Sequence, residues 1–249
     1  MVQVLIIFTK GAIIMSDTTF IKQKAQAIPA NDIFIAEKAQ TTETTNKLIR
    51  NTYTLLSMTL AFTAFTSWIA MTLKLPHPGF LITLVGFFGL FFVTAKLKDS
   101  AWGLVAIFAL TGFMGLTLGP ILNHYLHAFR NGHELIMMAF GSTAVIFLAL
   151  SGYALTTKKD FSFLSGFLFV GLIVALFGML AAWLFAIPAL QLAISAVVVL
   201  LMAGYILYDT SNIVNGYETN YIMATIALYL DIYNMFVNLL ALFGLAGED

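Results

Sequence analysis

Long apolar runs, each bounded by charged residues, dominate the sequence from residue 50 onward. A membrane-spanning helix needs about 20 consecutive apolar residues to cross about 30 Å of hydrocarbon. The charge-free intervals that satisfy this length are 50–74, 74–96, 99–130 with its membrane part at 100–122, 134–158 and 160–209. A last apolar stretch, 219–247, contains one charge, Asp231. The interval 160–209 is too long for one helix, and Pro188 divides it into two spans with a turn near 186–189. The pattern therefore predicts seven membrane-spanning helices.

Short polar or helix-breaking segments connect these runs. Residues 74–79 contain two prolines and a glycine, which is typical of a turn. The segments Asp99-Ser100 and Asp160-Phe-Ser162 each supply a polar residue that can cap the helix that follows. The apolar runs are continuous rather than alternating, which excludes a β-barrel, the other structure that spans membranes. We expect an all-α integral membrane protein, with a seven-transmembrane-helix bundle over residues 48–246.

The first 47 residues are a polar segment of mixed charge. We expect a cytoplasmic N-terminal tail, either without packed structure or serving as a recognition segment for a partner. The apolar stretch Val2–Phe8 is too short to span a membrane, and no positive charge precedes it, so it is a poor signal peptide. Met15 is the more natural start, and residues 1–14 are then an upstream extension.

The overall composition supports the membrane assignment. Apolar residues make up 60% of the 249 and charged residues only 10%, with 12 basic residues against 12 acidic ones. Soluble domains carry about 25% charged residues. A neutral chain also lacks the surplus of Lys and Arg that binding to nucleic acid requires. The sequence has no cysteine, which excludes disulfides, thiolate metal sites and cysteine nucleophiles.

The distribution of Lys and Arg predicts the orientation, because short cytoplasmic loops carry the excess of positive charge. One side of the predicted bundle holds Lys22, Lys24, Lys38, Lys47, Arg50, Lys96, Lys98, Lys158 and Lys159. The other side holds only Lys74 and Arg130. We therefore expect a cytoplasmic N-terminus and, with seven spans, a C-terminus that faces outward.

Two acidic residues, Asp209 and Asp231, fall inside the last two predicted spans. Ionisable groups at membrane depth are costly and are therefore candidates for function. By helical spacing, each shares a face with other polar side chains. We expect this polar shell to consist of Tyr205, Tyr208, Asn212, Asn234 and Asn238.

The relative depth of the two aspartates depends on where the chain turns. Equal depth requires a turn centred on Asn220, which is midway between them, whereas Gly216 favours an earlier turn. If the carboxyl groups meet, burial and mutual repulsion make them share a proton. Loss of that proton at higher pH separates the helices or attracts a cation, and Ca²⁺ prefers such oxygen ligands. The alternative places one or both carboxyl groups in interfacial water near a helix end.

Other functional interpretations of the polar residues have less support. Tyr208-Asp209 matches one half of an intramembrane aspartyl protease site, but Asp231 lacks the Gly-x-Gly-Asp context of the other half. No catalytic triad, phosphate-binding loop or zinc-protease motif is present, so we expect neither an enzyme nor a small-molecule substrate or cofactor. His124, His127, His133 and Glu134 make a metal site conceivable in one loop.

Three glycines in the third span, Gly112, Gly115 and Gly119, form a small-residue face. Such faces let two membrane helices approach closely. We expect this face to serve helix packing.

Several motifs together resemble those of the Bax-inhibitor (transmembrane BAX inhibitor motif) family, and most closely its bacterial YccA-type branch. The motifs are Leu48-Ile-Arg-Asn-Thr-Tyr53, Thr111-Gly-Phe-Met-Gly-Leu-Thr-Leu-Gly-Pro-Ile-Leu122, Thr156-Thr-Lys-Lys-Asp-Phe-Ser162, Tyr208-Asp-Thr-Ser-Asn-Ile213, Glu218-Thr-Asn-Tyr221 and Leu228-Tyr-Leu-Asp-Ile-Tyr-Asn234. The resemblance covers about residues 45–246, in the same order and spacing.

The resemblance implies a seven-helix bundle with one of two functions. Family members that have both aspartates behave as pH-sensitive calcium leak channels, and Asp209 and Asp231 are the matching positions here. Some of these channels also use an arginine near the pair, and the predicted spans of this chain contain none. The YccA-type branch instead implies a non-channel modulator that binds the membrane protease FtsH, with the N-terminal tail involved. Either function places the protein in the bacterial inner membrane.

Overall fold

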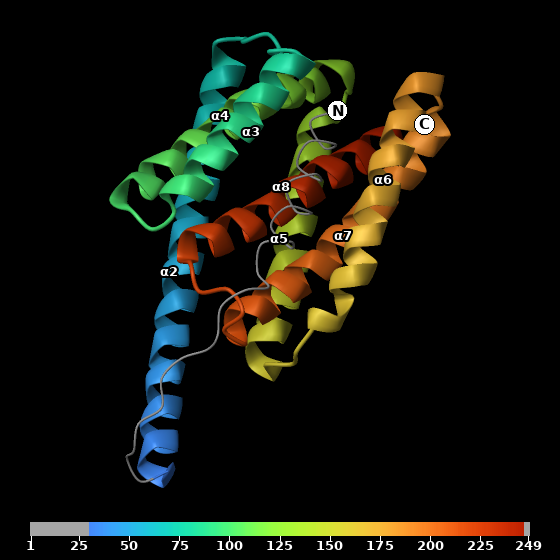
Figure 1. Cartoon of the computed structure of the whole chain (residues 1–249). Helices are drawn as coiled ribbons and strands as arrows, with labels where there is room; N and C mark the ends of the chain where they lie inside the picture. Colours follow the sequence, from blue (N-terminus) through green and yellow to red (C-terminus); the bar gives the residue numbers. More distant parts are fainter. Residues whose placement is uncertain (1–29, 247–249) are drawn as a thin grey trace.

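The computed structural model describes residues 30–246, and in that part of the chain every regular element is helical (Figure 1). The elements are α2 (Ala30–Thr72), α3 (Phe80–Leu97), α4 (Ala101–Ala128), α5 (Gly132–Thr157), the 3₁₀ turn η1 (Ser162–Leu164), α6 (Ser165–Phe185), α7 (Pro188–Val214) and α8 (Tyr221–Ala246). Seven of these helices are long and apolar enough to cross a membrane. They coincide with the seven predicted spans, which confirms the all-α membrane fold.

Helix α2 begins before the first predicted span. It runs without interruption from Ala30 to Thr72, across the boundary that we expected at residue 47. In Figure 1 its first turns extend beyond the rest of the bundle. The proposed extension at residues 1–14 lies outside the described residues, and the extent of the N-terminal tail stays a prediction.

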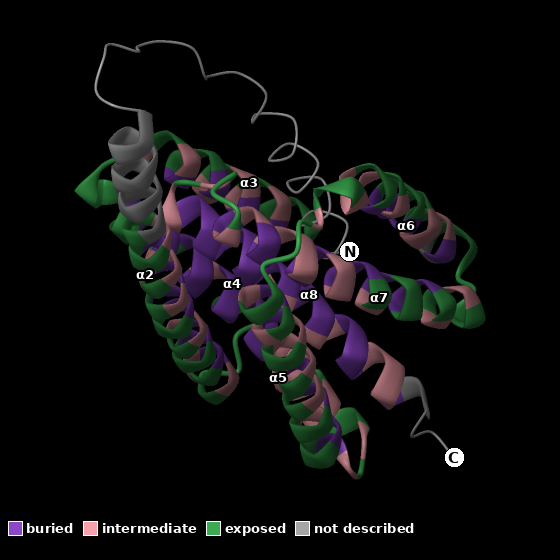
Figure 2. Cartoon of the chain, turned by 90° about the horizontal axis from the view of Figure 1, so that it is seen from below, coloured by how far each residue is buried: buried purple, intermediate pink, exposed green. Residues whose placement is uncertain are grey.

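Helix α8 forms the centre of the bundle. Of its membrane-spanning window 67% is buried, compared with 22–56% for the other six spans. One apolar core joins α8 to α2, α3 and α4, and a second core joins it to α5, α6 and α7. Figure 2 shows the buried residues concentrated along α4 and α8, with exposed residues on the outer faces of the surrounding helices. The polar groups of α8 therefore lie between two apolar cores.

The glycine face of α4 packs directly against α2, as the sequence predicts. A methyl group placed at Gly115 would lie 2.5 Å from the backbone oxygen of Thr63, and one at Gly119 would lie 2.8 Å from the backbone oxygen of Ser67. Such distances are shorter than van der Waals contact, so only glycine permits this approach of the two helices.

The two predicted helix caps have different outcomes. Asp160 accepts a hydrogen bond from the Ser162 amide at 2.8 Å and so caps the turn that precedes α6. Ser100 occupies the N-cap position of α4, but its side chain makes no capping hydrogen bond. Its hydroxyl donates instead to the Leu97 carbonyl at 2.9 Å, which closes the end of α3. Pro188 begins α7, and the turn before it lies at Ala186 and Ile187, as predicted.

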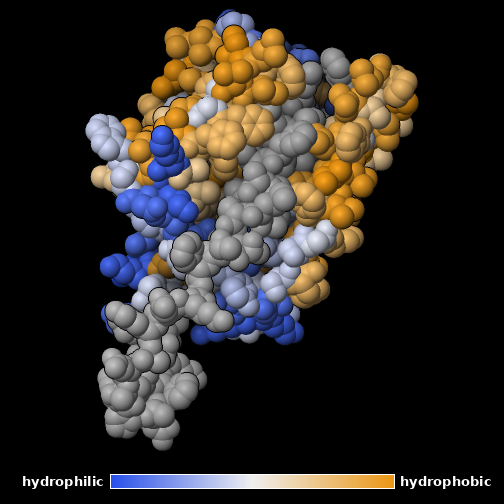
Figure 3. All heavy atoms as spheres, viewed as in Figure 1, coloured by the Kyte–Doolittle hydropathy of each residue, from blue (hydrophilic) through white to orange (hydrophobic). Residues whose placement is uncertain are grey.

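The outer surface of the bundle is largely apolar, as contact with lipid requires. Exposed side chains include Trp102, Phe167 and Leu200, each about 70% exposed. Figure 3 shows hydrophilic residues near the α5–α6 and α7–α8 loops and beside the α3–α4 loop, and mostly apolar residues toward the opposite end of the bundle.

Candidate functional site

The antiparallel packing of α7 against α8 brings the two acidic spans together. Asp209 lies five residues before the end of α7, and Asp231 lies ten residues after the start of α8. At a rise of about 1.5 Å per residue, Asp231 is therefore about 7 Å farther from the connecting loop, measured along the helices. The loop occupies residues 215–220 and turns at Gly216, where φ is +77°. The turn is thus earlier than Asn220, which explains the offset between the two aspartates.

Tyr205 lies close to the depth of Asp231. It is nine residues from the end of α7, and Asp231 is ten residues from the start of the facing helix α8. Its side chain is buried and lies within electrostatic range of both Asp209 and Asp231. Of the polar-shell residues expected from the sequence, Tyr205 is the one for which the structure gives an electrostatic interaction with both carboxyl groups.

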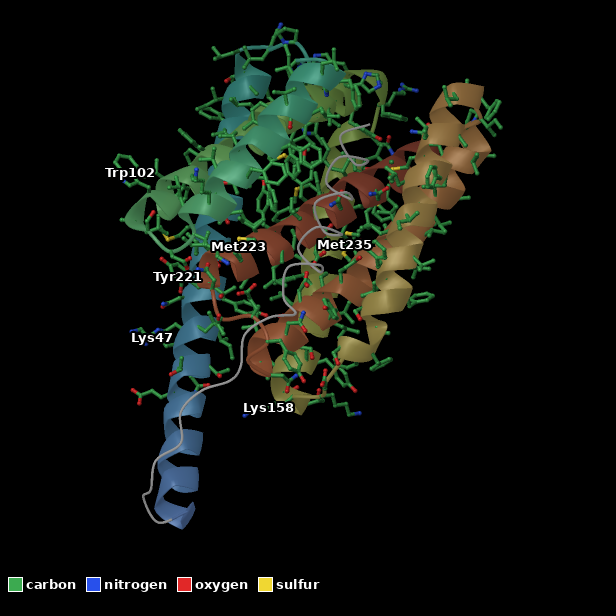
Figure 4. All side chains as sticks on the ribbon, in the orientation of Figure 1. Lys47, Trp102, Lys158, Tyr221, Met223 and Met235 are labelled. Atoms are coloured by element: carbon green, nitrogen blue, oxygen red, sulfur yellow. The ribbon has the colours of Figure 1, made fainter. Side chains whose placement is uncertain are left out.

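The two aspartates differ in burial. Asp231 has no exposed surface, whereas Asp209 is half-buried. Figure 4 shows the segment of α8 between Met223 and Met235, which contains Asp231, crossing the middle of the bundle. Asp231 therefore lies inside the protein, while Asp209 lies nearer the loop end of the pair.

A stripe of amide side chains continues from Asp231 along α8. Asn234 and Asn238 are both buried. The Asn234 Nδ2 donates to the Leu230 carbonyl, and the Asn238 Nδ2 donates to the Asn234 carbonyl, each at 2.8 Å. Tyr208 and Asn212, the other expected shell residues, are half-buried on α7.

Sequence reasoning missed a cluster of hydroxyl groups that joins three helices. The Tyr53 hydroxyl on α2 is hydrogen-bonded to the Ser151 hydroxyl on α5 and lies 3.5 Å from the Thr210 hydroxyl on α7. Thr210 follows Asp209 directly. On α8, Thr225 donates to the Thr52 carbonyl at 3.3 Å. Helix α2, which continues from the N-terminal segment, therefore contacts the α7–α8 pair close to Asp209.

A second missed contact joins α2, α4 and α8. The Thr63 hydroxyl donates to the Thr111 carbonyl at 3.0 Å and is hydrogen-bonded to the Tyr229 hydroxyl at 2.8 Å. All three residues are buried. A threonine or tyrosine in an apolar run signals an interhelical hydrogen bond, but its partner depends on how the helices are rotated.

The α5–α6 loop and the α7–α8 loop are hydrogen-bonded to each other at the end of the bundle near Asp209. The Asp160 carboxylate accepts hydrogen bonds from the Ser162 amide and, at 2.9 Å, from the Tyr217 hydroxyl. These hydrogen bonds, that of the Ser162 amide foremost, hold the pKa of Asp160 below its ordinary value of 3.8. The Ser211 hydroxyl accepts from the Phe161 amide and donates to the Lys159 carbonyl. The α5–α6 loop is therefore held against the end of α7.

Asn220 fixes the start of α8. Its Oδ1 accepts from the amides of Ile222 and Met223, and its Nδ2 donates to the Lys98 carbonyl and to the Asp99 carboxylate. It thus serves both as the N-cap of α8 and as a link to the α3–α4 loop.

The histidines near the α4–α5 loop do not form a metal site. No group of three or more His, Asp or Glu side chains is placed to hold a metal ion among the residues that the structure describes. The His127 Nδ1 is instead hydrogen-bonded to the Asn123 carbonyl at 2.7 Å. Asp209 and Asp231 likewise supply two carboxyl groups rather than three, so the Ca²⁺ role expected of them stays a prediction.

The fold and the buried acid on the central helix define a seven-helix integral membrane protein with polar side chains buried between two apolar cores. Residues 45–248 match the family model described as "Inhibitor of apoptosis-promoting Bax1". The chain belongs to this Bax-inhibitor family, as its motifs predict. The match begins within α2 and includes all of the helices that follow.

Bacterial relatives match over most of their length. The chain is 52% identical over 205 residues to the modulator of FtsH protease YccA of Escherichia coli, covering 82% of this chain and 93% of that protein. It is 55% identical over 202 residues to an uncharacterized protein of Pseudomonas aeruginosa, covering 81% of this chain and 90% of that protein. An uncharacterized membrane protein of Vibrio cholerae is 45% identical over 206 residues, which are 82% of this chain and 92% of that protein.

Proposed function

We propose that this protein modulates an FtsH-type membrane protease and that this modulation requires no channel activity. The observation that carries the proposal is the 52% identity to the E. coli protein named a modulator of FtsH protease, over 93% of its length. Identity at this level over 82% of this chain and 93% of the relative favours a shared function as well as a shared fold.

The proposal includes the orientation of the protein in the membrane and a contact segment for the protease, residues 15–45. A relative that is also 52% identical is named an inner membrane protein, which supports the same membrane here. Lys47 and Lys158 lie toward one end of the molecule in Figure 4, and the excess of positive charge at this end favours a cytoplasmic position. The segment that leads into α2 then faces the cytoplasm, where it is available to contact the protease, and the C-terminus faces outward.

Deletion of residues 15–45 tests this function. We expect the deletion to alter the FtsH-dependent turnover of a membrane substrate in cells that produce the protein. Asp209→Asn combined with Asp231→Asn leaves the contact segment intact, so this double variant is expected to act like the wild type. Unchanged turnover after the deletion, with the protein present at wild-type level, contradicts the proposal.

A second candidate function is a pH-sensitive cation leak, with Ca²⁺ as the ion. The observation that favours it is the full burial of Asp231, level with Tyr205, which lies within electrostatic range of both acids. In this mechanism protonation of the two acids holds α7 and α8 together at low pH. Loss of these protons leaves two negative charges that repel each other and attract a cation. The two functions are compatible in one protein.

A further inference from the structure

We infer that Asn234 and Asn238 extend the acid pair into a cation-binding track along α8, from Asp231 toward the end of the bundle opposite the 215–220 loop. The track consists of the carboxyl group of Asp231 and the side-chain oxygens of Asn234 and Asn238. Its ligand is a hard cation that prefers oxygen ligands, with Ca²⁺ as the representative. The inference rests on the proposed cation leak, because it assigns that function a binding site beyond the two aspartates.

The orientation of each amide follows from its own hydrogen bond. A backbone carbonyl only accepts, so the atom that contacts it must be the amide nitrogen. The Nδ2 atoms of Asn234 and Asn238 are held this way, each on the carbonyl four residues earlier. In each amide the Nδ2 contacts the backbone carbonyl, so the Oδ1 is the atom that faces away from it. The hydrogen bond of the Nδ2 thereby fixes the position of the Oδ1.

Both of these oxygens are buried without a hydrogen-bond donor. Asn234 is 1% exposed and Asn238 is fully buried, and neither Oδ1 accepts a hydrogen bond within the described part of the chain. A buried acceptor in a membrane protein has no bulk water to compensate it, so such groups are rare unless they bind something. Two of them one turn apart on the same helix indicate a common ligand.

Among the described residues, neither α7 nor α5 supplies a donor to these two oxygens. At this depth α7 contributes Val198 and Met202, which pack with Met235 and Leu239 in an apolar core. The buried hydroxyl of Thr143 on α5 donates to the Ala139 carbonyl of its own helix. The oxygens thus lie between the two apolar cores, where a bound ion is shielded from lipid.

The spacing suits a track rather than a single closed cage. Asp231, Asn234 and Asn238 share one helix face at i, i+3 and i+7. From the first to the last they span about 10 Å along the axis. The side-chain oxygens of Asp231 and Asn234 are about one helical turn apart, and so are those of Asn234 and Asn238. An ion can pass from the carboxylate to the amides in two short steps while water completes its coordination.

Equilibrium binding of radiolabelled Ca²⁺ to the purified full-length protein in detergent, at pH 8 and constant ionic strength, tests the track. We expect Asn234→Leu and Asn238→Leu each to weaken binding about tenfold or more. Asn238→Asp adds a negative oxygen and is expected to tighten binding. The matched control is Asn215→Leu, because the Asn215 Nδ2 makes the same bond to the carbonyl four residues earlier but lies outside the membrane spans.

The outcomes separate this inference from the leak itself. Unchanged Ca²⁺ affinity in both leucine variants, or equal weakening in the Asn215→Leu control, overturns the track. The Asn238→Asp variant keeps the test informative if a leucine variant fails to fold, because unchanged or weaker binding in that variant also counts against the track. If wild-type protein binds Ca²⁺ through these residues yet liposomes show no flux, the leak fails and the track stands.

Discussion

Gly115 of α4 faces Thr63 of α2 so closely that a Cβ atom at Gly115 would lie 2.5 Å from the Thr63 backbone oxygen. Backbone atoms cannot move aside as a flexible side chain can, so the substitution forces the two helices apart. Because Thr63 also hydrogen-bonds to Tyr229 of α8, the displacement reaches the central helix.

Gly115→Ala is therefore expected to destabilise the protein by about 1–3 kcal/mol, the usual cost of overpacking. Thermal unfolding in detergent measures the change. The matched control is Gly141→Ala on α5, where an added Cβ meets nothing within 4 Å and the gain in helix propensity is the same. If both variants unfold at the same temperature, the close packing of α2 on α4 is not a source of stability.

The hydroxyl cluster at Tyr53 gives a second prediction. Tyr53→Phe removes the group that is hydrogen-bonded to Ser151 and keeps the ring that packs against Phe147. Loss of one such bond costs about 0.5–1.5 kcal/mol. We expect a lower unfolding temperature than for Tyr153→Phe, whose hydroxyl contacts only the exposed Lys159 in the hydrogen bonds described. Equal unfolding temperatures for the two variants contradict a stabilising role for the cluster.

The bond between Asp160 and Tyr217 predicts a dependence on pH. The pKa of Asp160 is lowered in the folded protein, so its stabilising effect is complete above the unfolded value and is lost as the pH falls through the folded value. Hydrogen exchange of peptides covering residues 158–164, corrected for intrinsic rates, is expected to show less protection below about pH 3.8 than at pH 6. Asp160→Asn is expected to abolish this difference. An identical pH profile in the variant contradicts the assignment.

Calcium flux into liposomes tests the second candidate function. If protonation of Asp209 and Asp231 holds α7 and α8 together, flux through the wild-type protein is expected to be higher at pH 8 than at pH 6. Asp209→Asn plus Asp231→Asn removes the titrating groups and is expected to remove the dependence on pH. Equal wild-type flux at both pH values, unaffected by the double substitution, rules out gating by these acids.

The seven spans could be predicted because the thickness of the membrane fixes the length of each apolar run, and charges mark where the runs end. The packing of Gly115 could be predicted because small residues at helical spacing have few other uses. The contact between Tyr53 and Ser151 could not, since residues 98 positions apart meet only when the rotation of each helix is known.

Prediction of the site from the sequence was limited in a similar way. Periodicity places Asp231, Asn234 and Asn238 on one helix face, and all three are buried in the structure. The offset of about 7 Å along the helices between Asp209 and Asp231 depends on the 215–220 loop, whose turn is earlier than the sequence midpoint. Ser100 shows the same limit locally, because its hydroxyl closes the preceding helix rather than capping the next.

Proteolysis in a defined system tests the central claim most directly. Purified FtsH and the full-length protein would be reconstituted together in liposomes, and the degradation rate of an FtsH membrane substrate measured with and without the protein. A change in rate of about twofold or more is expected with the wild type and with the Asp209→Asn, Asp231→Asn variant, but not with the variant lacking residues 15–45. A degradation rate that is the same with and without the wild-type protein would contradict the proposed role as a modulator.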